Sequence, residues 1–156
     1  HNLGMSALKY FILKVDPKKR MLFNPAESID MNGNTGTFIS YTYARIRSVL
    51  RKGGAMKLAN DQFTAHDPSK EEKLLIKLIY QYPTIIKAAS DAYNPALVAG
   101  YSYDLAKAYN HFYHEHIVVD AEQKETTSFR LHLSEMTSLV ISKCMAMIGI
   151  TVPERM

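Results

Sequence analysis

The sequence predicts an all-α protein, an antiparallel helical bundle. Apolar residues recur at intervals of three and four over several long segments, as they do along one face of a helix. Proline, glycine and capping residues separate these segments by short connections. Almost no stretch alternates between apolar and polar residues, which is the pattern of a half-buried strand. Long helices joined by short connections favour an antiparallel bundle around one core.

Composition limits the classes of protein to which the chain can belong. At 156 residues and 47% hydrophobic content, it is long enough for one domain with a substantial core. The formal net charge of +4 favours an anionic partner. The single cysteine, Cys144, excludes a disulfide framework and indicates a reducing compartment, so we expect a cytoplasmic protein. No apolar run approaches the roughly 18 residues of a membrane span, so no membrane partner is expected.

The first predicted helix covers residues 3–15 and ends at Asp16, because the residue before a proline avoids the α region. The basic run 18–20 that follows is typical of a solvated loop. Residues 31–36 then combine two glycines with small polar residues, which can supply positive φ and an N-cap for the next helix. The expected buried residues of the first helix are Leu8, Phe11, Ile12 and Val15.

The segment 34–52 predicts the central helix of the protein. Ile39, Tyr43, Ile46 and Leu50 share one face, which we assign to the core. Phe38, Tyr41, Arg45, Ser48 and Lys52 fall on nearly the opposite side. This stripe of aromatic and basic side chains suits stacked bases and phosphates. The alternative is that a neighbouring element covers it, as happens to most aromatic residues on helices.

Gly53 and Gly54 end this helix, and a loop through His66 follows. Asp67 is then the expected N-cap of a helix through residue 80, and Pro83 starts a shorter helix over 84–92. Asn94 and Pro95 repeat the cap-and-proline pattern before a second long core helix. The expected buried residues of these helices are Leu74, Leu75, Leu78, Ile79, Leu97, Tyr101, Leu105, Ala108 and Phe112.

Thr126 or Thr127 is the expected cap of the last long helix, which Gly149 closes. The tail 150–156 is apolar enough to dock on the bundle. His111, His114 and His116 have a spacing that allows a metal site, but no carboxylate or cysteine with ligand spacing accompanies them, so we expect surface histidines and no bound metal. The expected buried residues of the last helix are Phe129, Leu133, Met136, Val140, Cys144 and Met147.

Three stretches, in this order along the chain, resemble the C-terminal region of arginyl-tRNA synthetase, a class I aminoacyl-tRNA synthetase. They are ALKYFILKVDP from Ala7 with GNTGTFISYTYARIRSVLRK from Gly33, then YNPALVAGYSYDLAKAYNHFYHEH from Tyr93, and finally the terminal GITVPERM. The resemblance implies that residues 1–30 are the last elements of a catalytic region and that residues 31–156 form a helical anticodon-binding domain. No HIGH-like or KMSKS-like element occurs. The resemblance therefore further implies a fragment of an arginine-tRNA ligase without catalytic residues or a cofactor of its own. In the full-length enzyme, ATP would be bound elsewhere.

The resemblance also implies which residues contact the arginine tRNA. The RNA-facing positions of the family correspond to Phe38, Tyr41 and Arg45, to Tyr101 on the later helix, and to Met156 beside the unstacked anticodon bases. We expect Phe38 and Tyr41 to stack on bases and Arg45 to contact a phosphate or a base edge. Tyr101 belongs to the predicted core, so only its hydroxyl would reach outward. A monomer that binds arginine tRNA is the leading hypothesis, and a helical protein-interaction bundle without RNA binding is the alternative.

Overall fold

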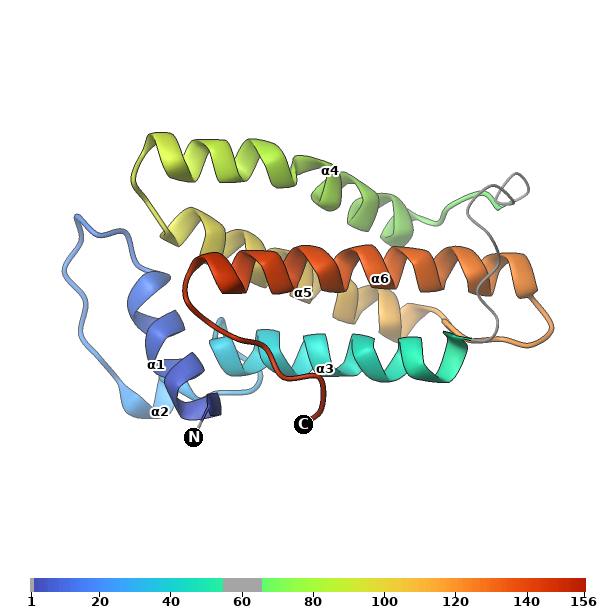
Figure 1. Cartoon of the computed structure of the whole chain (residues 1–156), viewed down its shortest axis with the longest axis horizontal. Coiled ribbons are helices and arrows are strands. Elements are labelled where there is room, and N and C mark those ends of the chain that lie inside the picture. Colours follow the sequence, from blue (N-terminus) through green and yellow to red (C-terminus); the bar gives the residue numbers. More distant parts are fainter. Residues whose placement is uncertain (1, 55–65) are drawn as a thin grey trace.

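The structure, a computed structural model, describes residues 2–54 and 66–156; most of the loop expected after Gly54 lies outside the described residues. Helices α3 and α6 run along the long axis beside α4 and α5, and the direction of the chain alternates from each of these four helices to the next (Figure 1). The described residues contain no strand, so the all-α antiparallel bundle is confirmed. The helices are α1 (Asn2–Leu13), α2 (Pro25–Ser28), α3 (Gly36–Gly53), α4 (Lys70–Asp91), α5 (Ala96–Glu115) and α6 (Lys124–Met147).

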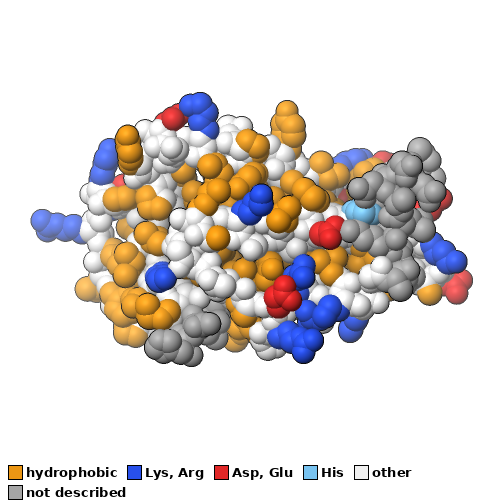
Figure 2. Space-filling model, viewed as in Figure 1, with side chains coloured by type: hydrophobic (Ala, Val, Ile, Leu, Met, Phe, Trp, Pro, Cys, Tyr) orange, Lys and Arg blue, Asp and Glu red, His pale blue; other side chains and the backbone are white. Residues whose placement is uncertain are grey.

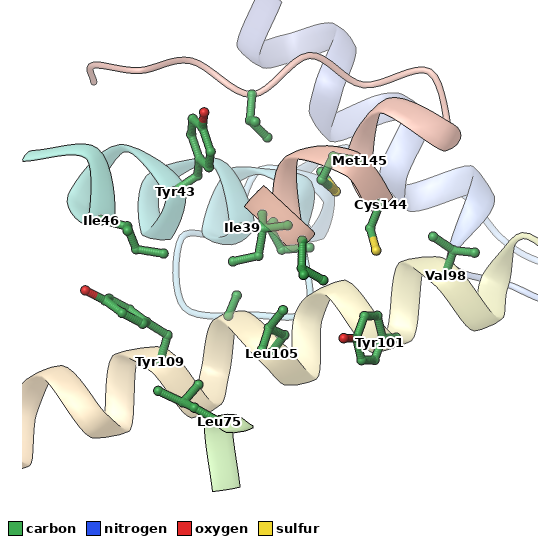
Figure 3. Packing of buried hydrophobic residues seen from close by; sticks show 14 of the residues in the cluster. Ile39, Tyr43, Ile46, Leu75, Val98, Tyr101, Leu105, Tyr109, Cys144 and Met145 are labelled. Carbon is green, nitrogen blue, oxygen red and sulfur yellow. The ribbon is translucent and has the colours of Figure 1, made fainter. Parts of the chain in front are cut away.

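The core lies between α3, α5 and α6 (Figure 3). Ile39 and Ile46 of α3 are fully buried and pack with Leu105 of α5 and Met145 of α6. Full burial of such a side chain stabilises the fold by about 1.5 to 3 kcal/mol. The inward face predicted for α3 is therefore confirmed, and it fixes which side of this helix faces outward.

Several residues expected in the core are exposed instead. Their exposed fractions range from 41% for Leu97 to 55% for Met147. Helical spacing identifies a face that can be buried, but the width of the buried arc depends on how many neighbours cover the helix. The predictions that were wrong concern Ile12, Leu74, Leu97, Met136 and Met147.

The helix starts also differ from those predicted. The N-cap of α4 is Ser69, in a capping box with Glu72, and not Asp67. Pro83 lies inside α4 rather than at the start of a second helix. An interior proline removes one backbone hydrogen bond and can kink a helix instead of ending it. Helix α6 begins at Lys124, before both threonines proposed as its cap.

Helix α3 begins against α1. The Thr35 hydroxyl caps α3 by accepting from the Phe38 N–H at 3.1 Å. A Cβ on Gly36 would lie 2.7 Å from the Ser6 carbonyl oxygen, so this glycine allows a close approach of the two helices. Gly33 and Gly36 do not use the positive φ that a glycine allows, since among the described residues only Tyr93 and Gly149 have one.

The C-terminal tail docks on the bundle, as predicted. After α6 it turns at Gly149, whose φ is +73°, and crosses α3 (Figure 1). Ile150 and Val152 are buried, and Lys9 donates a hydrogen bond to the Gly149 carbonyl at 2.7 Å. The end of the chain is thereby held beside the outward face of α3. Across the described ranges, no helix has the length and apolarity needed to span a membrane.

Candidate nucleic-acid interface

A groove with a volume of about 940 Å³ runs along the outward face of α3. We call it the α3–α5 groove. Its walls come from α3, from the last turn of α5 with the residues that follow, and from the end of the tail. The side chains that line it are Tyr41, Ala44, Arg45, Ser48, Val49, Arg51, Lys52, Tyr113, His114, Glu115, His116, Ile117, Val118, Val119, Arg155 and Met156.

The charges along the α3–α5 groove are mainly positive. Arg45, Arg51, Lys52 and Arg155 line it, whereas Glu115 is the only acidic residue on its walls within the described chain. Figure 2 shows several basic side chains, with an acidic group among them, in the region where the tail crosses α3. Such a distribution attracts the phosphates of a nucleic acid.

Arg45 lies at the aromatic end of the groove. Its guanidinium carbon is 4.9 Å from the ring centre of Tyr41 and 5.1 Å from that of Tyr113, so it makes a cation–π contact with a ring from each helix. Tyr41 is 40% exposed, which leaves ring surface for a further stack. The Arg45 Nη1 donates to the Asn110 Oδ1 at 2.5 Å.

The tail closes the groove on one side because α3 anchors it. Arg47 pairs with the Glu154 carboxylate at 3.1 Å, and Arg51 donates to the Glu154 backbone carbonyl at 3.3 Å. Met156, two residues further on, is 53% exposed and lines the groove. The terminal side chain is thus brought to the same site as Arg45, over one hundred residues away in the sequence.

The structure brings together three of the five predicted site residues. Tyr41, Arg45 and Met156 line the α3–α5 groove. Phe38 lies about one turn before Tyr41, is half-buried, and packs against Tyr103 of α5 with 5.4 Å between ring centres. Its ring is therefore shared between the core and the surface next to the groove.

Tyr101 does not belong to this surface. It is 6% exposed, and Figure 3 shows it among the buried side chains. Its hydroxyl donates to the Leu78 carbonyl of α4 at 2.8 Å, and burial raises the pKa of this phenol. The expectation that the hydroxyl reaches outward is wrong, because α4 covers this side of α5.

The sequence analysis did not identify Tyr113 and Asn110, two residues of α5 that contact Arg45. These residues are three apart and so share one face of the helix. An amide followed by an aromatic residue at this spacing, within an apolar helical pattern, was the signal available. It gave no indication that α3 was the partner.

A buried ionic cluster adjoins the groove at His116. The Glu72 carboxylate is fully buried; it accepts from Arg130 at 2.7 Å and contacts the His66 ring nitrogen at 2.9 Å. Burial would raise the pKa of Glu72, but the hydrogen bonds from Arg130, the Ser69 N–H and His66 outweigh it and hold the pKa below its ordinary value.

His116 contacts Glu71 at 3.1 Å and is half-buried, so it is not an ordinary surface histidine. In the described parts of the chain, no cluster of three or more potential ligands could hold a metal.

Comparison with known proteins places these features in context. The family model of the DALR anticodon binding domain matches residues 39–156. The chain is 48% identical over 156 residues to an arginine–tRNA ligase of Porphyromonas gingivalis, and 51% identical to one of Parabacteroides distasonis. Each alignment covers 99% of this chain and 26% of the relative, so the chain spans about a quarter of the length of these proteins.

Solved structures have the same fold. The arginyl-tRNA synthetase of Thermus thermophilus superposes with a TM-score of 0.88 at 24% identity, over 99% of this chain and 27% of that one. The arginyl-tRNA synthetase of Plasmodium falciparum gives a TM-score of 0.82 at 27% identity, with the same coverage. At these identities the superpositions support the helical architecture.

Proposed function

The chain belongs to the DALR anticodon-binding domain family, and from this premise we propose that it binds the anticodon loop of an arginine tRNA in the α3–α5 groove. The observation that carries the proposal is the convergence of Tyr41, Arg45 and Met156 on one basic groove. Aromatic rings stack on unstacked bases of a single-stranded loop, while arginine and lysine neutralise its phosphates or bond base edges.

Each wall of the groove has its own role in this proposal. Tyr41 offers the exposed ring on which a base stacks, and Phe38 supports a second base at the edge of the groove with the part of its ring that α5 leaves uncovered. Arg45 contacts a base edge or a phosphate. Arg51, Lys52 and Arg155 supply the field that attracts the RNA backbone, and Met156 packs beside an unstacked base.

Attachment of arginine to its tRNA would take place in a longer protein of the arginine-tRNA ligase type, in which ATP binds outside this domain. The glycine-containing turn 31–36 does not fit a nucleotide phosphate, because Gly36 is packed against the Ser6 backbone of α1. We also propose that residues 1–30 form the last elements of the catalytic region, and that residues 31–156 form the anticodon-binding domain. The family match from residue 39 onward supports this division.

A titration of the 156-residue chain with a fluorescein-labelled arginine tRNA transcript tests the proposal. We expect tighter binding than to a tRNA of another specificity, and an affinity that falls as salt rises. Each phosphate contact contributes a slope of about 0.7 in a log–log plot for single strands. Lys52→Ala should lower the affinity and the slope, whereas Lys87→Ala, an exposed lysine of α4 outside the groove, should leave both unchanged. Equal affinity for both tRNAs without salt dependence would instead favour a protein-interaction bundle.

A further inference from the structure

Arg45 is held by α5 as well as by its own helix. Its Nη1 donates to Asn110 at 2.5 Å, and its guanidinium lies over the rings of Tyr41 and Tyr113. We propose that Asn110 is a positioning residue for RNA recognition. It holds the Arg45 guanidinium against the two rings, so that the remaining donors of Arg45 face the groove before RNA binds.

The amide of Asn110 has one possible orientation. Its Nδ2 donates to the Thr42 hydroxyl at 2.7 Å, and this fully buried hydroxyl donates its one proton to the Phe38 carbonyl at 2.9 Å. Thr42 can therefore only accept from Asn110, and a guanidinium can only donate to it. Both partners require the Asn110 oxygen to point at Arg45, so the backbone of α3 fixes the acceptor that holds Arg45.

The arrangement leaves Arg45 with unused donors. Of the five guanidinium N–H groups, one bonds Asn110 and one approaches the Tyr41 hydroxyl at 3.4 Å. Within residues 2–54 and 66–156, Arg45 makes no further side-chain hydrogen bond, so its other donors remain for RNA. An unrestrained arginine loses much rotamer freedom when it binds, whereas this side chain is already ordered in the free protein.

This inference rests on the proposed function and deepens it. A fixed guanidinium distinguishes bases by the direction of its hydrogen bonds, whereas a freely rotating one adapts to any anion. Loss of Asn110 should thus reduce the preference for arginine tRNA as well as the affinity. A residue that merely supported the fold would change the melting temperature instead.

The test is a double-mutant cycle with fluorescein-labelled arginine tRNA transcript. Asn110→Ala should weaken binding about tenfold in the wild-type background, since ordering of an arginine is lost, and less than about twofold when Arg45→Ala is already present. Asn110→Leu, which fills the volume of the amide, should behave in the same way if the alanine variant does not fold. Tyr109→Phe is the matched control. Tyr109 is next to Asn110 in α5 but lies outside the groove, and this substitution removes its buried hydrogen bond to Ser134.

The outcomes separate this inference from the function on which it rests. Non-additive loss with Arg45→Ala, together with unchanged binding by Tyr109→Phe, would support positioning through Arg45. An equal loss from the Asn110 variants in both backgrounds, or no loss while Arg45→Ala weakens binding, would overturn the inference and leave the proposed function intact. Unchanged binding by Arg45→Ala itself, with no preference for arginine tRNA, would overturn both.

Discussion

Tyr41 and Ile46 belong to the same helix but have opposite surroundings. Tyr41 is 40% exposed and lines the α3–α5 groove, whereas Ile46 is fully buried between α3 and its neighbours. Either residue type would suit a core, so only its place around the helix axis decides whether the side chain is buried or lines the groove.

Truncation of these two side chains should therefore have opposite effects. We expect Tyr41→Ala to weaken binding of arginine tRNA by about 1 to 3 kcal/mol, the cost of one lost base stack, with little loss of stability. Ile46→Ala should lower the free energy of unfolding by about 2 to 5 kcal/mol through the cavity that it leaves. Chemical denaturation and fluorescence titration measure the two effects. Equal destabilisation by both variants would mean that Tyr41 belongs to the core.

Tyr101 provides a second test at the scale of one residue. Tyr101→Phe removes the hydrogen bond to the Leu78 carbonyl and leaves the ring in the core. We expect a loss of about 0.5 to 1.5 kcal/mol in the free energy of unfolding and no change in tRNA affinity. Weaker tRNA binding at unchanged stability would show instead that this hydroxyl takes part in recognition.

At the scale of elements, the tail is divided into an anchored part and a terminal part. Ile150 and Val152 are buried, and Glu154 is bound by Arg47 and Arg51. Arg155 and Met156 lie beyond these contacts and are exposed. The anchored part belongs to the fold, and the terminal part belongs to the groove.

Removal of Arg155 and Met156 should separate the two roles. We expect tRNA affinity to fall by about 1 kcal/mol, the scale of one interface side chain, because a cation and an apolar wall of the groove are lost. The melting temperature should shift by less than about 2 °C, since the buried residues remain. Arg47→Ala, which removes an anchor, is the comparison variant and should weaken binding through a loosened tail. Unfolding of the truncated chain would assign the last two residues to the fold.

At the scale of the whole molecule, the Glu72 cluster joins helices that are distant in sequence. Arg130 of α6 binds Glu72 at the start of α4, and its Nη1 donates to the Ile117 carbonyl after α5 at 2.8 Å. A charge this deeply buried destabilises the fold strongly when its partner is lost. The cluster thus links α4, α5 and α6 next to the groove.

This cluster makes the free energy of unfolding depend on pH in the acidic range. The pKa of Glu72 is held below its ordinary value in the folded state, so its contribution is complete above that value, about 4.5, and is lost as the pH falls through the lower folded pKa. The free energy of unfolding in urea should therefore decline from about pH 5 downward. Glu72→Gln should be less stable by about 3 to 5 kcal/mol at pH 6 and should show a shallower decline. A decline as steep as in the wild-type chain would mean that other carboxylates govern the transition.

Much of this protein could be read from local patterns. The 3.6-residue period predicted most of the helical segments and the inward face of α3, because that period depends only on neighbouring residues. The same helical period placed Tyr41 and Arg45 on the outward face. The apolar content of the tail was enough to predict that it docks on the bundle. Each of these features depends on residues that are close to one another in the sequence.

Other features depended on packing between distant segments. Arg45 and Asn110 are 65 residues apart, and no local pattern pairs them. Tyr101 is buried because α4 covers its side of α5, and Leu97 is exposed although its helical spacing predicts burial. A helical period states which residues share a face, but the identity of the element against that face follows from the docking of whole helices. The sequence alone therefore determined the helical class, the inward face of α3 and the candidate stripe. Tertiary packing decided the exact helix bounds, the groove, its terminal wall and the restraint on Arg45.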